Sequence, residues 1–189
     1  MLDVTAGPDP LKPLTSDNMT APADQLFQEL YAELKHLASS YMRRQSPAHT
    51  LQATALVAEA YLKMEGSRCG RWGSRPHFMA CAAQAMRWVL VDHARHRATR
   101  AEASPRRRVR LDGLLAAMEE GNPDIEALHE ALTTLEQLGG KAKRAARVVE
   151  IRFFAGQTMA EIATALEITE RTVRRDWEFF RTWLATTLK

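Results

Sequence analysis

The 189-residue sequence has few of the residues that cross-link a fold or hold a metal ion. Its two cysteines, Cys69 and Cys81, form no CxxC motif and have no histidine at metal-ligand spacing. This pattern excludes a disulfide framework and a zinc site, and it indicates a reducing compartment. No apolar run approaches the length that crosses a bilayer, and no signal peptide is visible. We therefore expect a cytoplasmic protein without a metal ion or a membrane partner.

Residues that favour strands or covalent catalysis are also scarce. Runs of β-branched residues are few, whereas alanine, leucine, glutamate and arginine dominate, so we expect an all-α fold. No serine or cysteine stands in a nucleophile motif. A nucleic-acid enzyme that used Asp92, His93 and His96 would need a further acidic or cysteine ligand at metal-binding spacing, which is absent. We therefore predict no catalytic residue and no cofactor.

Charge is segregated along the chain, although the net charge is only +3. Residues 1–22 and 23–65 carry −2 and −1, residues 66–110 carry +9, residues 111–140 carry −7, and residues 141–189 carry +4. Two basic blocks separated by an acidic one indicate two surfaces that face a polyanion, joined by a segment that does not.

The clearest pattern lies at residues 158–184, where two short amphipathic helices are predicted. Apolar residues recur at helical spacing from Met159 to Leu166 and again from Val173 to Leu184. Thr158 with Glu161 three residues later forms a capping box, and Thr169 is the expected N-cap of the second helix. The intervening turn has the length of a helix-turn-helix motif, although Glu167 takes the place of the usual glycine.

The second of these helices carries arginines away from its apolar stripe. Such a cationic helix fits a DNA major groove, where arginine reads guanine edges. The alternative is an ordinary amphipathic pair whose arginines only face solvent. The candidate contacts to DNA are Thr169, Glu170, Arg171, Arg174, Arg175 and Arg181.

The N-terminal half begins with a proline-rich tail, residues 1–22, that lacks periodicity and is predicted to be disordered. Helices are predicted from Asp24 to about Gln45, over residues 51–64 and over residues 77–97. Residues 66–76 form a loop that combines three glycines and three arginines with Trp72. Trp72 either stacks on a base of single-stranded nucleic acid or folds back over the core of its domain.

A linker is predicted over residues 101–123, between Pro105 and Pro123, with a short helix near residues 111–118. Its acidic residues either shield the protein's own basic surfaces or are simply solvated. Two further helices are predicted: one is capped by Asp124 and stops at Gly139-Gly140, and the other covers residues 142–154. With the helix-turn-helix they make a four-helix C-terminal domain.

Three strings, in this order, resemble one branch of the bacterial extracytoplasmic-function (ECF) sigma factors. They are HTLQATALVAEAYLKME, WGSRPHFMACAAQAMRWVLVDHARHRA and ARVVEIRFFAGQTMAEIATALEITERTVRRDWEFFRTWL. The resemblance runs from about Asp24 to Leu184. It implies two small helical domains joined by an acidic linker: a tail at 1–22, a sigma-two-like domain at 23–100, the linker at 101–123, and a sigma-four-like domain at 124–189.

The resemblance also implies a role for each part. The helix at 51–64 would dock on core RNA polymerase through Gln52, Leu56, Glu59 and Lys63. The following loop and helix would melt the minus-ten promoter element, and the helix-turn-helix would bind the minus-thirty-five element. The residues expected at the minus-ten element are Arg68, Arg71, Trp72, Arg75, Arg87, Trp88 and Arg95.

Two functions remain open at the level of the sequence. The first is an alternative sigma factor, whose expected partners are core RNA polymerase and promoter DNA, with either an anti-sigma factor or another regulator as a further candidate. The second is a helix-turn-helix regulator that never joins polymerase, which predicts symmetric dimers and palindromic sites. Co-purification with core polymerase separates the two functions.

Overall fold

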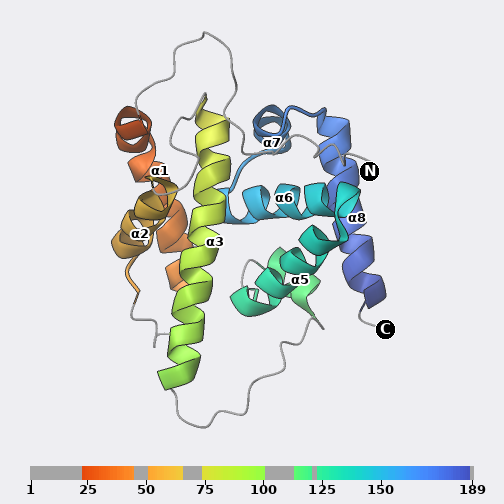
Figure 1. Ribbon diagram of the computed structural model, residues 1–189, viewed down its shortest axis with the longest axis horizontal. Coiled ribbons are helices and arrows are strands. Elements are labelled where there is room, and N and C mark those ends of the chain that lie inside the picture. Colours follow the sequence, from red (N-terminus) through yellow and green to blue (C-terminus); the bar gives the residue numbers. More distant parts are fainter. Residues whose placement is uncertain (1–22, 45–50, 66–73, 101–112, 121–122, 188–189) are drawn as a thin grey trace, which may run out of the picture.

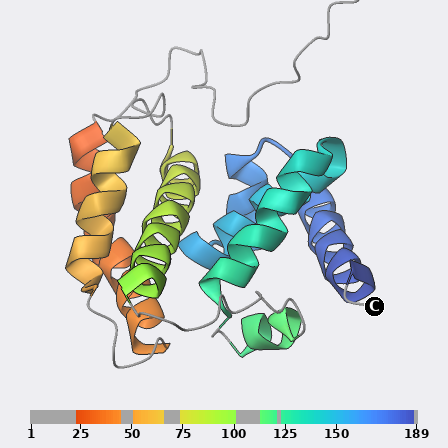
Figure 2. The same ribbon diagram turned by 60° about the horizontal axis from the view of Figure 1, so that its bottom comes forward.

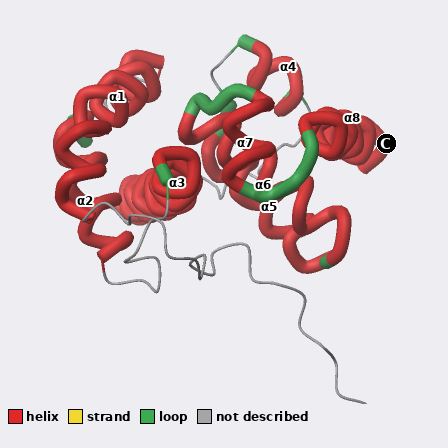
Figure 3. The backbone as a smooth tube through the Cα atoms, turned by 90° about the horizontal axis from the view of Figure 1, so that it is seen from above, coloured by secondary structure: helices red, strands yellow, loops and turns green. Residues whose placement is uncertain are grey.

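A computed structural model describes residues 23–44, 51–65, 74–100, 113–120 and 123–187 (Figure 1). Within these ranges all regular structure is helical, which confirms the predicted all-α class (Figure 3). The predicted tail and most of the loop at 66–76 lie outside the described residues. The helices are α1 (Ala23–Arg44), α2 (Ala53–Glu65), α3 (Arg75–Arg100), α4 (Leu114–Glu119), α5 (Ile125–Leu138), α6 (Gly140–Ala155), α7 (Met159–Ala165) and α8 (Glu170–Thr187).

Local sequence signals set the helix starts in the C-terminal half. The Asp124 side chain accepts hydrogen bonds from the backbone N–H groups of Glu126 and Ala127, which confirms it as the N-cap of α5. Thr158 and Glu161 form the predicted reciprocal capping box at the start of α7. Helix α5 ends at Leu138 with Gly139 as its C-cap, as predicted, but α6 begins at Gly140, before the predicted start at residue 142.

The turn between α7 and α8 is a Schellman motif with glutamate at the position that glycine usually takes. The N–H of Ile168 donates to the carbonyl of Ala163, and the N–H of Glu167 donates to that of Thr164. Glu167 has a φ of 54°, in the left-handed region. The glutamate that stands in place of the usual turn glycine therefore adopts a strained backbone conformation.

Helix α3 runs through the middle of the molecule and is covered on two sides. Helix α2 packs on one side with α1 against it, while α5, α6 and α7 lie on the other (Figures 1 and 2). Between His77 and Val91 almost every α3 side chain is buried, as expected for a helix without a solvent-facing side. Segments 23–100 and 123–187 therefore pack against each other through α3.

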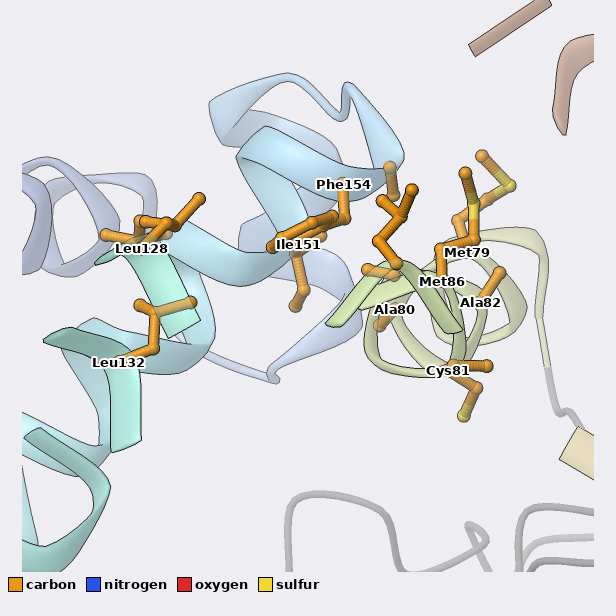
Figure 4. Packing of buried hydrophobic residues seen from close by; sticks show 14 of the residues in the cluster. Met79, Ala80, Cys81, Ala82, Met86, Leu128, Leu132, Ile151 and Phe154 are labelled. Carbon is orange, nitrogen blue, oxygen red and sulfur yellow. The ribbon is translucent and has the colours of Figure 1, made fainter. Parts of the chain in front are cut away.

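The buried apolar residues form one continuous cluster that spans both segments. Figure 4 shows its middle, where Ala80 and Met86 of α3 lie in the same cluster as Ile151 and Phe154 of α6. Tyr41 of α1 adds an aromatic contact across the same boundary, with its ring centroid 5.4 Å from that of Phe153.

The strained turn generates a paired stability prediction. Glu167→Gly removes the left-handed strain and should raise the melting temperature by about 2–3 °C, since the net gain is roughly 0.5–1 kcal/mol. Gly156→Ala should do the opposite, because Gly156 has a φ of 64° and an added Cβ would lie 2.9 Å from Leu37 Cδ2. Differential scanning calorimetry measures both changes, and a destabilised Glu167→Gly variant would contradict the interpretation.

Candidate nucleic-acid interface

The helix-turn-helix is built as the spacing predicts. Ile162 and Ala163 of α7 are buried, as are Val173, Phe180 and Leu184 of α8. Asp176 also lies on the buried side of α8, which the sequence analysis missed. Its carboxylate accepts two hydrogen bonds from Arg144 of α6, at 2.5 and 3.0 Å. This paired contact fixes how α8 sits on α6, and the hydrogen bond to Asp176 raises the pKa of Arg144.

The outer side of α8 presents cations to solvent. Arg171, Arg174 and Arg175 are exposed, and Arg171 and Arg175 make no hydrogen bond or ion pair with another described residue. Arg174 pairs with Glu170 at 2.9 Å, but both side chains are exposed, so the pair is weak. The start of the helix is held by Thr169, whose hydroxyl accepts the N–H of Thr172 at 3.2 Å.

Arg181, near the end of α8, is engaged by the predicted linker. Glu119 of α4 accepts a hydrogen bond from it at 3.1 Å, and Glu178 lies 3.7 Å away. For Glu119 the structure therefore favours the first possibility left by the sequence, in which an acidic linker residue covers a basic surface. Arg152 of α6 stacks over Trp177, 5.1 Å from the ring centroid.

Arg87 was predicted as a DNA contact and, in this structure, that prediction is wrong. Its side chain is only 1% exposed and points from α3 into a pocket formed by α5 and α6. The helical spacing placed Arg87 off the apolar stripe predicted for this helix. It gave no sign that the C-terminal half covers the opposite side of the same helix.

All five N–H donors of Arg87 find acceptors in this pocket, which we call the Arg87 socket. Nε donates to His129 Nδ1 at 3.1 Å. One terminal nitrogen donates to Glu136 at 2.6 Å and Glu150 at 3.1 Å, and the other to the His129 carbonyl at 3.2 Å and Thr133 at 3.0 Å. Every partner lies on α5 or α6. A buried guanidinium is tolerated only when it is paired in this way.

A second arginine crosses the same boundary in the opposite direction. Arg147 of α6 donates to the carbonyl of Ala80 on α3 at 2.8 Å and also pairs with Glu150. Glu150 thus lies between the two arginines and is itself buried. The sequence offered one sign of this cluster, because Arg147 and Glu150 stand within an otherwise apolar part of α6.

The other residues predicted to contact the minus-ten element differ in their exposure and in their partners. Arg75 is half-exposed and pairs with Glu33 of α1 at 2.7 Å and Glu161 of α7 at 2.6 Å, and the hydrogen bonds to Glu161 and Glu33 raise its pKa. Trp88 is partly exposed beside His129, with ring centroids 5.2 Å apart, and Arg95 is exposed. Arg68, Arg71 and Trp72 lie outside the described residues.

The predicted docking face on α2 needs one correction. Leu56 is fully buried beneath the helix and takes part in the core, so it has no surface to offer a partner. Gln52 is exposed. Glu59 accepts a hydrogen bond from His93 at 3.1 Å, and Lys63 pairs with Asp92 at 3.1 Å, so both partly exposed side chains also tie α2 to α3.

The described residues also bear on two other functions, metal binding and insertion into a membrane. Among the described residues, no group of three histidine, cysteine, aspartate or glutamate side chains is arranged to hold a metal ion. Within the same part of the chain, every helix is too short or too polar to span a bilayer.

The fold and the surface of α8 define an all-α protein with a helix-turn-helix whose second helix exposes a row of arginines. The family model of the ECF sigma factors matches residues 15–189, and the chain belongs to that family. It is therefore a transcription regulator that works as an alternative sigma factor with RNA polymerase and promoter DNA, as the resemblance implied. Searches of curated proteins and of solved structures each found no match.

The Arg87 socket generates a pH prediction. Burial, followed by the positive charges of Arg87 and Arg95, lowers the pKa of His129 to about 4 from 6.5. A depressed histidine pKa means that the unfolded chain binds more protons than the folded one. The contribution of neutral His129 to the free energy of unfolding is therefore complete above pH 6.5 and is lost as the pH falls towards 4. His77 acts in the same direction, because burial lowers its pKa too.

Urea unfolding between pH 8 and pH 5 measures this dependence. His129→Asn keeps an acceptor for Arg87 Nε but cannot titrate, so its stability should fall less steeply than that of the wild type below pH 6.5. Parallel curves for the two proteins would contradict the role assigned to His129.

Proposed function

We propose that this sigma factor recognises promoters through two separate modules. Residues 124–189 bind the minus-thirty-five element through α8, and residues 23–100 bind and melt the minus-ten element while α2 docks on core polymerase. The observation that carries the proposal is the exposed row of arginines on α8, held in place by the Arg144–Asp176 pair. The polymerase supplies the catalysis, so the chain needs no catalytic group of its own.

The exposed side of α8 supports two kinds of contact. Arg171 and Arg175 lie one turn apart on the same face, are exposed and have no acidic partner among the described residues, which suits direct reading of guanine edges. Arg174 and Arg181 already have carboxylate partners at the surface. Phosphate groups can replace those carboxylates, so we assign these two arginines to backbone contacts.

The docking face on α2 is reassigned around Leu62. This leucine is 65% exposed, next to the exposed Ala58 and Lys63. A large apolar side chain left in solvent on a helix is a common anchor for a partner protein. Core polymerase is the partner that the ECF family implies, so we place Leu62 at the centre of that contact together with Gln52, Glu59 and Lys63.

Arg175→Ala tests base recognition. It should lower discrimination at one base pair of the minus-thirty-five element by about 5- to 150-fold, equivalent to roughly 1–3 kcal/mol, and leave other positions unchanged. Arg174→Ala is the matched variant: it should weaken all sequences alike and reduce the salt slope of binding by about 0.9. Fluorescence anisotropy with a set of single-substituted duplexes measures both, and a uniform loss for Arg175→Ala would reassign it to phosphate.

Leu62→Arg tests polymerase binding. It should reduce the affinity for core RNA polymerase at least tenfold, because a buried contact would receive a charge. Leu138→Arg is the control, since Leu138 is 62% exposed at the end of α5, far along the chain from α2. Both variants should keep the wild-type melting temperature, because neither position is packed.

Co-purification with core enzyme gives the measurement. Wild-type protein that fails to bind core polymerase, and instead forms symmetric dimers on palindromic DNA, would replace the sigma-factor mechanism with that of an independent regulator. Equal binding by the two variants would remove α2 from the docking surface while leaving the function intact.

A further inference from the structure

We propose that a cleft between α1, α4, α6 and α8 binds a small amphipathic anion, which is a ligand with an aromatic body and a single carboxylate or sulfonate group. The cleft has a volume of about 430 Å³, within the range of small-molecule sites. Its lining comes from all four helices, with α4 lying beside α8 (Figure 3). The proposal rests on the shape and chemistry of this cleft and does not depend on the proposed function.

Most of the described lining is apolar, and much of it is half-buried. Each half-buried side chain packs against the core and also borders the cleft, so part of its apolar surface faces the open space. These side chains are Leu37 of α1, Leu115 and Met118 of α4, Phe153 of α6 and Trp177 of α8. Apolar surface that water covers favours a ligand whose own apolar body displaces that water.

The space persists because the surrounding elements do not fill it. Helix α4 is six residues long and packs mainly on α8, which leaves Leu115 and Met118 at the edge of the cleft. Gly156, the C-cap of α6, also lines it and has no side chain to offer. A Cβ added at Gly156 would lie 2.9 Å from Leu37 Cδ2, so a larger residue there would push α1 away.

Three aromatic rings from three helices form part of the wall. The ring centroid of Tyr41 lies 5.4 Å from that of Phe153, and Phe153 meets the buried Phe154 edge-on at 4.9 Å. These contacts hold the Phe153 ring in place, and Trp177 of α8 adds the third ring. Rings that are already fixed suit a flat aromatic body, because stacked and edge-on ring contacts are then available without further ordering.

The charge available to a ligand in this cleft is positive. Arg152 of α6 lines it and is exposed, and its guanidinium lies over Trp177, 5.1 Å from the ring centroid. Among the described residues no carboxylate pairs with Arg152. Glu119, the acid of the described lining, is already bound by Arg181 at 3.1 Å. A guanidinium donates two parallel hydrogen bonds to an oxyanion, so Arg152 selects an anionic ligand.

Two fluorescent probes with the same aromatic body test the site. 1-Anilinonaphthalene-8-sulfonate carries an anionic group, and N-phenyl-1-naphthylamine is the same molecule without it. Both become brighter in apolar surroundings, so titration of the full-length chain at roughly 0.15 M salt gives a Kd for each probe. We expect one saturable site for the sulfonate, with a Kd on the order of 10–100 μM for a ligand of this size.

The variants separate the charge of the cleft from its volume. Arg152→Gln should weaken the sulfonate by at least about fivefold and change the neutral probe by less than about twofold, because the guanidinium serves the sulfonate alone. Met118→Trp should weaken both probes by at least about tenfold, because the larger side chain fills the cleft. Lys143→Gln is the matched control, since it removes the same charge from an exposed position of α6 outside the lining and should change neither affinity.

Circular dichroism checks that each variant keeps the helix content of the wild type. If Met118→Trp loses helix content, Arg152→Gln decides, because Arg152 is exposed and lies outside the core. A wild-type chain without saturable binding of either probe, or a folded Met118→Trp chain that binds both as before, would overturn the site. Equal weakening of the sulfonate by Arg152→Gln and Lys143→Gln, or equal weakening of both probes by Arg152→Gln, would overturn the anionic ligand.

Discussion

The burial of the Arg87 guanidinium is the constraint on which the arrangement of the helices depends. A charge with five donors can leave water only if acceptors surround it in its own plane, and α5 and α6 supply them from His129, Thr133, Glu136 and Glu150. Buried ion pairs of this kind add little net stability, because the desolvation cost offsets most of the attraction. Their effect is that one packing of α3 on α5 and α6 has a much lower free energy than the alternative packings.

The sequence predicted well what neighbouring residues decide among themselves. The caps at Asp124 and Thr158 and the buried stripe of α8 depend on spacings of three or four residues, and the structure has them all. Arg87 and Leu56 were misplaced for a different reason. Helical spacing says which residues share a side of a helix, but not how many other helices cover it, and α3 turned out to be covered on both sides.

Glu167 and Asp176 mark an intermediate case, in which the sequence raised a question that only packing could answer. An acid in place of the turn glycine could have meant a different turn, yet Ala163 and Thr164 still receive the two Schellman hydrogen bonds. Asp176 stands at a position of α8 that should be apolar. Its ion-pair partner, Arg144, lies on another helix. Because the two residues are thirty-two positions apart, no helical spacing rule links them.

The segregation of charge along the chain acquires a physical meaning from these contacts. The acidic stretch 111–140 supplies Glu119 to Arg181 and Glu136 to Arg87, so it neutralises one arginine in each basic block. The two contacts differ in what they leave open. Arg181 and Glu119 are both exposed, so in the proposed complex a DNA phosphate would compete with Glu119 for this guanidinium, because carboxylate and phosphate each present two acceptor oxygens to it. Arg87 is buried with Glu136 at its edge, so there the acidic stretch serves the packing of α3 on α5.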